Sequence, residues 1–278
     1  MPDSKLNKLN MINILESAAR EAGTILLSYY QKELRIEHKD DAHQIVTEAD
    51  KVCEKAIENH ILREMKKKGI PVDQIGFIGE EGLHKSGTYT FIIDPLDGTS
   101  NFAAGIDYFC VSIGLAKNSE LIAGVIYDPV RDTMFLAEQG KGANMISSTQ
   151  TKKLHIQHAP LAHSLAVMGF YPKKSSLTQW FTIAQDLVPL THNVRWLGAF
   201  ELDLCYVALN RFSFVIGKPF IWDFAAGYCI VKESGGTVVD WDNKEIVLDF
   251  SDPQKGYPIL ACHPKNKSVI LPFLYNNF

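Results

Sequence analysis

Residues 92–102 read Ile-Ile-Asp-Pro-Leu-Asp-Gly-Thr-Ser-Asn-Phe, and both the fold and the chemistry are best approached from this stretch. An apolar strand runs directly into Asp94 and Asp97, and Pro95 is expected to end the hydrogen-bonded ladder of that strand. Carboxylates at a strand end supply the oxygen ligands that hard cations prefer. The glycine turn that follows exposes backbone N–H groups, which suit a phosphate. In the simpler alternative Asp97 is only a cap between strand and helix, but two acids without a basic neighbour favour a ligand site.

Two further acidic stretches are candidates for the same site. Residues 79–82, Gly-Glu-Glu-Gly, follow an apolar run, although on their own they would be an ordinary solvated loop. Asp223 lies in the segment Trp-Asp-Phe-Ala-Ala-Gly over 222–227, where it is placed to cap a helix, a role compatible with binding a ligand. Carboxylates that share one pocket repel one another strongly unless metal ions neutralise them.

The other motifs exclude several chemistries. Thr47 and Asp50 form a capping-box pattern, for which a purely structural role is the first interpretation. The nine histidines lack the spacings of a zinc site or of a histidine-based triad. No glycine-rich nucleotide-binding loop follows a predicted strand. Zinc and nucleotide cofactors are therefore not indicated.

Size and composition indicate an ordinary globular protein. The chain has 278 residues, and a chain of this length buries about 70% of its surface on folding. With 28 Lys and Arg against 32 Asp and Glu, the net charge is −4, so no basic nucleic-acid surface is expected. Residues 1–13 do not resemble a signal peptide, and no apolar run is long enough for a membrane span. Five scattered cysteines predict no disulfide framework, so we expect a cytoplasmic protein that contacts neither membranes nor nucleic acids.

The spacing of apolar residues predicts the order of the elements. A helix is expected from Leu6 to Tyr29 and a second from Ala49 to Lys67, followed by strands over 75–79, 89–94, 108–117, 121–127 and 133–138. Helices over 176–187, 199–210 and 223–233 then alternate with short strands, and Gly235-Gly236 ends the last of them. This order favours layered α and β structure, an α+β fold. We expect a single domain over residues 1–278, with a subdomain seam near 140–163.

Taken together, these segments resemble the signature of the inositol monophosphatase family. The matching stretches are Gly-Glu-Glu at 79–81, Asp-Pro-Leu-Asp-Gly-Thr at 94–99 and Trp-Asp-Phe-Ala-Ala-Gly at 222–227, with Val-Thr-Glu-Ala-Asp at 46–50 upstream. Their order and spacing agree over nearly the whole chain. Fructose-1,6-bisphosphatases and bisphosphate nucleotidases share part of this pattern, but residues 99–102, Thr-Ser-Asn-Phe, are similar to the monophosphatase branch.

The resemblance implies a layered αβαβα sandwich and Mg²⁺-dependent hydrolysis of a phosphate monoester. It implies two or three Mg²⁺ ions: one held by Glu80, Asp94 and the Leu96 carbonyl, a second by Asp94, Asp97 and Asp223, and a third, weaker ion near Glu80. Four acids without a Lys or Arg in any of the motifs suit such a clamp. Two neighbouring ions can activate water and stabilise the leaving oxygen of an in-line displacement.

The resemblance also implies roles for the neighbouring residues. Thr99, together with Glu80, would activate the attacking water, and Asp50 would orient the Thr99 hydroxyl. The backbone amides of Gly98 and Thr99 would hold phosphate oxygens.

The substrate pocket departs from the family pattern. Inositol-specific members carry a glutamate six residues before the tryptophan of the Trp-Asp motif, where this chain has Ile216, or Val215 after a slip of one residue. The small residues of the family's substrate loop are replaced by Gly-Ala-Phe-Glu at 198–201. We expect Ala199, Phe200 and Ile216 to contact the substrate, and Glu201, at a helix start, to face solvent.

The predicted function is Mg²⁺-dependent hydrolysis of a small phosphate monoester by metal-activated water, with inositol monophosphate or a related sugar or polyol phosphate as substrate. One alternative is a phosphatase for histidinol phosphate or a 3′-phosphonucleotide. Another is a regulatory binding protein that retains the phosphatase fold. The resemblance also implies a homodimer.

Overall fold

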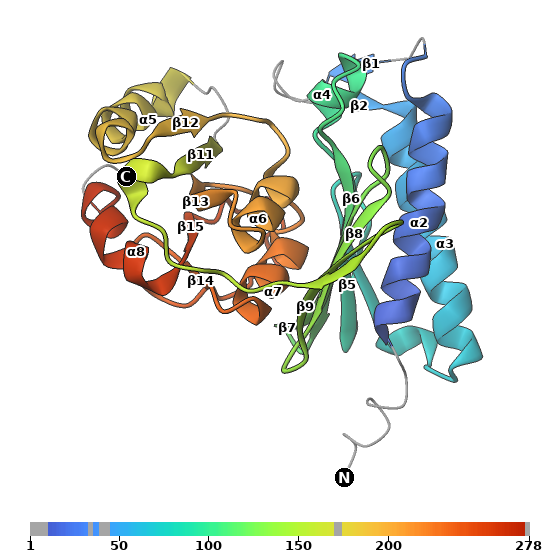
Figure 1. Cartoon of the computed structure of the whole chain (residues 1–278). Helices are drawn as coiled ribbons and strands as arrows, with labels where there is room; N and C mark the ends of the chain where they lie inside the picture. The colour runs from blue at the N-terminus through green and yellow to red at the C-terminus, as the bar shows by residue number, and fades with distance from the viewer. Residues whose placement is uncertain (1–10, 33–35, 39–44, 170–173, 276–278) are drawn as a thin grey trace.

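The computed structural model describes residues 11–32, 36–38, 45–169 and 174–275. Figure 1 shows the layers in order: helices α2 and α3, a large sheet, helices α6 and α7, a smaller sheet, and helices α5 and α8. This is the layered α+β sandwich that the sequence predicts. None of the described helices combines the length and the apolar character that a membrane span requires.

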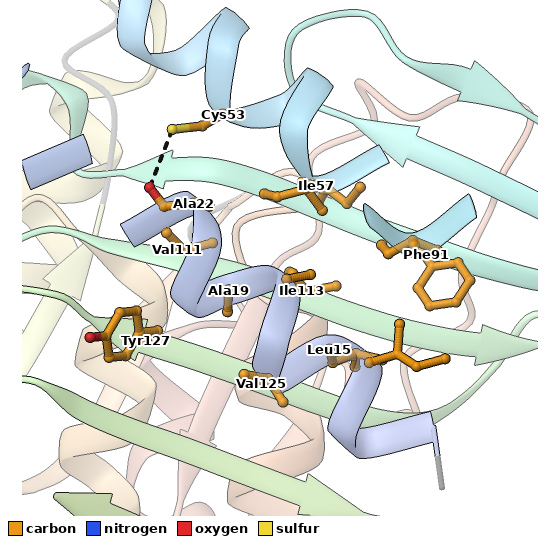
Figure 2. Packing of buried hydrophobic residues seen from close by; sticks show 14 of the residues in the cluster. Leu15, Ala19, Ala22, Cys53, Ile57, Phe91, Val111, Ile113, Val125 and Tyr127 are labelled. Carbon is orange, nitrogen blue, oxygen red and sulfur yellow. Dashed lines mark hydrogen bonds between the residues drawn. The ribbon is translucent and has the colours of Figure 1, made fainter. Parts of the chain in front are cut away.

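The two N-terminal helices cover one face of the large sheet. α2 runs from Met11–Tyr29 and α3 from Glu48–Lys67, as predicted, while the first two apolar positions of the expected helix, Leu6 and Leu9, lie outside the described residues. Small residues on α2 allow the helices to approach closely, and the Cys53 thiol lies 3.5 Å from the Ala22 carbonyl oxygen. Figure 2 shows this core, which includes Leu15, Ala19, Ile57, Phe91, Val111, Ile113, Val125 and Tyr127.

The large sheet has the strand order β10-β9-β8-β7-β6-β5-β3-β4. β3 and β5 are parallel, and the other neighbours are antiparallel, which includes the predicted meander. Its strands are β3 Ile75–Gly79, β4 His84–Lys85, β5 Tyr89–Asp97, β6 Cys110–Lys117, β7 Glu120–Asp128, β8 Thr133–Glu138, β9 Gly142–Ser147 and β10 Thr151–Lys153.

The end of β5 differs from the prediction. Asp94 pairs with Ser112 of β6, the register then shifts, and Asp97 pairs with Cys110. The expectation that Pro95 ends the strand is therefore wrong. Because proline has no N–H to donate, it is accommodated where the ladder is irregular, and pairing resumes beyond it.

The smaller sheet has the order β12-β11-β13-β15-β14. β11 is parallel to both of its neighbours, whereas β15 is antiparallel to β13 and β14. Its strands are β11 Leu165–Gly169, β12 Asn193–Arg195, β13 Phe212–Gly217, β14 Thr237–Val239 and β15 Ile259–Cys262. Helices α5 Lys174–Leu187 and α8 Pro264–Ile270 share a buried cluster with β11 and β13 on its outer side. The short elements are β1 Ile36–His38, β2 Ile45–Thr47, α4 Thr99–Ala103 and the 3-10 turns Val72–Gln74, Leu161–His163, Val188–Leu190 and Leu271–Phe273.

Helices α6 Phe200–Ala208 and α7 Ala225–Glu233 lie between the two sheets (Figure 1). Two glycines of the large sheet let α7 approach the strands. A Cβ atom on Gly124 would lie 2.5 Å from the Ala226 carbonyl oxygen, and one on Gly114 would lie 2.8 Å from the Ala225 Cβ. Only glycine fits at such a helix–sheet contact.

The five cysteines are free and buried. They are distributed through the layers: Cys53 on α3, Cys110 on β6, Cys205 on α6, Cys229 on α7 and Cys262 on β15.

Candidate active site

The end of β5 buries two aspartates beside a glycine turn. The side chain of Asp94 is 2% exposed and that of Asp97 is 7% exposed. Asp94 Oδ1 accepts a hydrogen bond from the Leu96 amide at 2.9 Å. Gly98 has a φ of 93°, and a Cβ atom there would lie 2.9 Å from the Tyr108 carbonyl oxygen. The left-handed turn therefore requires glycine.

Asp97 connects β5 to the start of α6. Its Oδ1 accepts from the Phe200 amide at 3.1 Å, and its Oδ2 accepts from the Glu201 amide at 2.7 Å. The first amides of a helix have no acceptor within the helix, and a carboxylate there also complements the helix dipole. Asp97 is thus a helix cap, but for α6 rather than for α4, the helix that follows it in the sequence.

Asp223 is buried just before α7, but it is not the N-cap. That position is Phe224, which makes no side-chain capping bond, and the helix begins at Ala225. The predicted capping role is therefore wrong. The chain makes an additional turn first, in which Asp223 Oδ2 accepts from the Phe220 amide at 2.8 Å. The Asp223 carboxylate therefore binds an amide that precedes it in the sequence and not an amide of the helix that follows.

Glu80, Asp94, Asp97 and Asp223 share one electrostatic environment. Burial, followed by the charges of the other three acids, raises the pKa of Asp94 well above its usual range. Burial and the charges of Glu80 and Asp97 do the same to the pKa of Asp223. Burial raises the pKa of Asp97 to about 7, although the two α6 amides oppose the shift. The structure therefore brings together four predicted acids from three segments of the chain.

Asp50 belongs to the capping box of α3 and also contacts Thr99. The Thr47 amide and hydroxyl donate to Asp50 Oδ2 at 2.8 and 2.5 Å. The Thr99 hydroxyl lies 3.2 Å from Asp50 Oδ1 and 3.0 Å from the Leu96 carbonyl oxygen. Because a hydroxyl has one proton to donate, the Thr99 oxygen keeps lone pairs that can accept a hydrogen bond. Burial raises the pKa of Asp50 to about 6.

Glu54 supports the loop that carries Glu80, and sequence reasoning missed it. Its side chain is 7% exposed, and its Oε2 accepts from the Glu81 amide at 3.0 Å. A Cβ atom on Gly79 would lie 2.0 Å from the same oxygen, so glycine is needed there. The available signal was the spacing of Asp50 and Glu54, which puts both acids on one face of α3.

The acid cluster fits Mg²⁺ by its chemistry. In the described part of the chain, no three His, Cys, Asp or Glu side chains form a ready-made metal cage. Mg²⁺ keeps several waters and binds through few carboxylates and substrate phosphates, so it does not need such a cage. The buried, mutually repelling oxygens of Asp94, Asp97 and Asp223 are hard ligands that a divalent cation would neutralise.

The expected substrate contacts are partly wrong. Ile216 is fully buried in the cluster under α5, and Val215 is fully buried on the opposite face of β13. Both faces of this central strand are covered, so neither side chain can meet a ligand. The Ala199 side chain is also fully buried, 3.1 Å from where a Gly98 Cβ would lie.

Phe200 is half-buried and covers the ends of two strands. Its ring atoms lie 2.6 Å from where a Cβ on Gly169 would be and 2.4 Å from where a Cβ on Gly217 would be. An aromatic ring therefore lies against β11 and β13 close to Asp97, which accepts from the Phe200 amide.

Glu201, which was expected to face solvent, is fully buried. The expectation treated the start of α6 as a surface. The helix lies between two sheets (Figure 1), and Glu201, Leu202 and Asp203 of its first turn are buried. Burial raises the pKa of Glu201 to about 8, while hydrogen bonds from Ser112, Gly227 and Ala226 oppose the shift.

The five-layer sandwich, with acids gathered at the end of β5 and before α7, defines the class of inositol monophosphatase and fructose bisphosphatase folds. Residues 7–274 match the inositol monophosphatase family, and the chain belongs to that family.

Curated relatives and solved structures agree with this assignment. The chain is 37% identical to a protein from Haemophilus influenzae named Nus factor SuhB, over 84% of this chain and 85% of the relative. It is 34% identical to inositol monophosphatase 1 of Solanum lycopersicum, over 84% of this chain and 85% of the relative. The crystal structure of the extragenic suppressor protein SuhB from Bartonella henselae has a TM-score of 0.82 at 29% identity, covering 96% of this chain and 98% of that one.

Proposed function

We propose that this chain hydrolyses a small phosphate monoester with Mg²⁺, and that the substrate is inositol monophosphate or a related sugar or polyol phosphate. The observation that carries the proposal is the burial of Asp94, Asp97 and Asp223 in one repulsive cluster beside the Gly98 turn. Burying several ionised carboxylates together costs free energy, and bound cations would offset that cost.

The residues divide into cation ligands and groups that handle water and phosphate. Glu80, Asp94 and the Leu96 carbonyl would hold one ion, Asp94, Asp97 and Asp223 a second, with a third near Glu80. Bound Mg²⁺ would supply charge stabilisation for the phosphoryl group and lower the pKa of a bound water.

The chain's own groups orient the reactants. The Thr99 hydroxyl donates toward Asp50 or Leu96, so its oxygen can accept a hydrogen bond from the attacking water. The proton that the water loses would go to a carboxylate, either to Glu80 directly or to Asp50 through the Thr99 hydroxyl, which gives up its own proton as it takes one from the water. The amides of Gly98 and Thr99, at the start of α4, would hold phosphate oxygens.

The test is the substitution Asp94→Asn in the purified full chain. Because Asp94 would contact two ions, we expect kcat/KM to fall by more than about a hundredfold while the circular dichroism spectrum is unchanged. Asp128→Asn is the matched control, since Asp128 is equally buried but pairs with Arg131 instead of other acids. An Asp94→Asn protein with native activity would overturn the proposal.

Substrate selection is expected to be broad. The chain has the apolar Ile216 or Val215 where inositol-specific relatives carry a carboxylate, and Phe200 where their substrate loop has small residues. Apolar contacts discriminate only by about 10–200-fold. We expect kcat/KM for inositol-1-phosphate to exceed that for glycerol-2-phosphate, adenosine monophosphate and histidinol phosphate by no more than about 10²-fold. A preference of about 10⁴-fold or more would show that another buried polar group recognises the ring hydroxyls.

A second candidate function is regulatory binding to a macromolecular partner. It is favoured by the relatives named Nus factor SuhB, of which the Haemophilus influenzae protein is one. Complementation separates the two proposals. If Asp94→Asn corrects the phenotype of cells that lack this protein, that phenotype depends on the regulatory role. If only the native chain corrects it, the phenotype depends on hydrolysis.

A further inference from the structure

Glu201 is a fully buried carboxylate where α6, β6 and α7 meet. Its Oε1 accepts from the Ser112 hydroxyl at 2.7 Å and from the Ala226 amide at 3.2 Å. Its Oε2 accepts from the Gly227 amide at 2.7 Å. Both amides belong to the first turn of α7, so Glu201 caps α7 from a neighbouring helix.

Each partner of Glu201 adjoins one of the aspartates of the acid cluster. Ser112 is the register partner of Asp94 across β5 and β6. The amides of Ala226 and Gly227 come directly after the turn that Asp223 closes.

The third connection is through the backbone. The Glu201 amide donates to Asp97 Oδ2 at 2.7 Å. Asp97 therefore caps α6, and Glu201, in the first turn of α6, caps α7. Glu201 thus joins β6, α6 and the start of α7, the three segments that border the buried aspartates.

The polar groups around Glu201 donate toward its carboxylate and oppose the effect of burial on its pKa. The Ala226 and Gly227 amides can only donate, and the Ser112 hydroxyl is free to do so. A Cβ atom on Gly227 would lie 2.5 Å from Glu201 Oε2, so glycine is required for this contact. A glutamine of the same size would point its NH₂ group at one of the two backbone donors, whichever way it turned.

We propose that Glu201 is a positioning residue whose carboxylate aligns Asp94, Asp97 and Asp223 for a divalent cation. The inference rests on the proposed function, since it assigns Glu201 to the same cation site. Glu201 itself touches neither the substrate nor the ion. It acts by fixing the relative positions of β6, α6 and α7.

The experiment measures Mg²⁺ binding directly. Native chain, Glu201→Gln and Glu201→Ala are titrated with Mg²⁺ by isothermal calorimetry, and the Mg²⁺ concentration for half-maximal hydrolysis is measured in parallel. Residues that orient metal ligands typically contribute about 10–100-fold to affinity, so we expect at least about tenfold weaker Mg²⁺ binding in both variants. We expect kcat to recover in part at saturating Mg²⁺, because the ligands themselves are intact.

Asp203→Asn is the matched control for the loss of a buried charge on α6. Asp203 is 1% exposed and accepts from the Tyr108 hydroxyl at 2.7 Å, so its bond does not reach α7. We expect this variant to lower the melting temperature in EDTA without changing Mg²⁺ affinity.

The outcomes are distinguishable. If the native chain binds Mg²⁺ and the Glu201→Gln variant, folded by circular dichroism, binds it equally well, the inference is wrong and the proposed function stands. If Asp203→Asn weakens Mg²⁺ binding as much as Glu201→Gln does, the effect is general destabilisation and the inference is wrong. If the native chain binds no Mg²⁺, the proposed function falls and the inference falls with it.

Discussion

Asp97 combines the role of a helix cap with the proposed role of a cation ligand on one carboxylate. Each of its oxygens accepts one amide of α6. A carboxylate has about four lone-pair sites, and Oδ2 also accepts a weak bond from the Cys110 thiol at 3.7 Å, so Oδ1 is the oxygen that retains a lone pair for a cation. The hydrogen bonds to α6 therefore orient the Asp97 carboxylate and still leave it able to bind a cation.

At Asp50 a mutation can separate the helix-capping role from the proposed role in orienting the Thr99 hydroxyl. We expect Asp50→Asn to lower kcat by at least about tenfold, because the Thr99 hydroxyl loses its charged acceptor, a loss of about 1.4 kcal/mol or more in transition-state stabilisation. Thr47→Ala is the control, since it removes the capping hydroxyl and costs about 1 kcal/mol of stability. Turnover and thermal unfolding are measured on both. Equal turnover in Asp50→Asn and native protein would leave Asp50 with the capping role alone.

At this scale the sequence predicted which acids gather but not how each is bonded. The carboxylates of 80, 94, 97 and 223 could be grouped because their motifs follow strands or precede a helix. The bonding of Asp223 could not, because the additional turn before α7 has no signature in composition. Glu201 was expected to face solvent and Ile216 to face the substrate, yet both are fully buried. The spacing of residues along the chain does not show whether neighbouring elements cover a helix start or both faces of a strand.

Among the elements, α7 depends most on residues that lack a side chain. Gly124 of β7 meets the backbone of Ala226, which cannot move aside without shifting the helix. We expect Gly124→Ala to destabilise the fold by about 1–3 kcal/mol, as overpacking does. Chemical denaturation at constant pH measures the change.

Gly256→Ala is the control for this substitution. The nearest atom there is Cγ of the flexible Lys218 side chain, at 3.3 Å, so we expect a change within about 0.5 kcal/mol. Equal stability of the two variants would mean that α7 can shift on the sheet, which contradicts the packing described above.

Most elements were predictable because their apolar periods are regular. α3 and the strands β3, β6, β7 and β8 lie within a few residues of their predicted bounds. The extension of β5 past Pro95 was not predictable, because a bulge depends on the partner strand and not on the proline alone.

The whole molecule should respond to pH through its buried acids. In the fold, the pKa is raised to about 6 for Asp50, to about 7 for Glu54 and Asp97, and to about 8 for Glu201. Unfolded acids titrate near 4, so from about pH 4 to 8 the folded state holds protons that the unfolded state releases. Without metal, stability should therefore fall as pH rises through this window.

Melting temperatures in EDTA and in saturating Mg²⁺ test this prediction. We expect a decline from about pH 5 to pH 8 in EDTA, and a smaller or reversed decline with Mg²⁺, which binds the ionised carboxylates. A melting temperature that rises with pH in EDTA would show that the acids are ionised in the metal-free fold.

We propose that the chain folds as one domain. One buried cluster combines Ile78 and Ile92 of the large sheet with Val167, Val215 and Ile259 of the smaller sheet. A division at the predicted seam near 140–163 would therefore cut through a shared core.

The distribution of buried thiols gives this molecule its own unfolding reporters. Burial raises the thiol pKa of every cysteine, and only the exposed thiolate reacts with an alkylating reagent. Because the cysteines sit in the layers from α3 to β15, pulsed alkylation followed by peptide mass spectrometry would time the opening of each layer separately. A single cooperative unit would label all five at one rate, whereas Cys262 reacting well before Cys53 would reveal a smaller sheet that opens on its own.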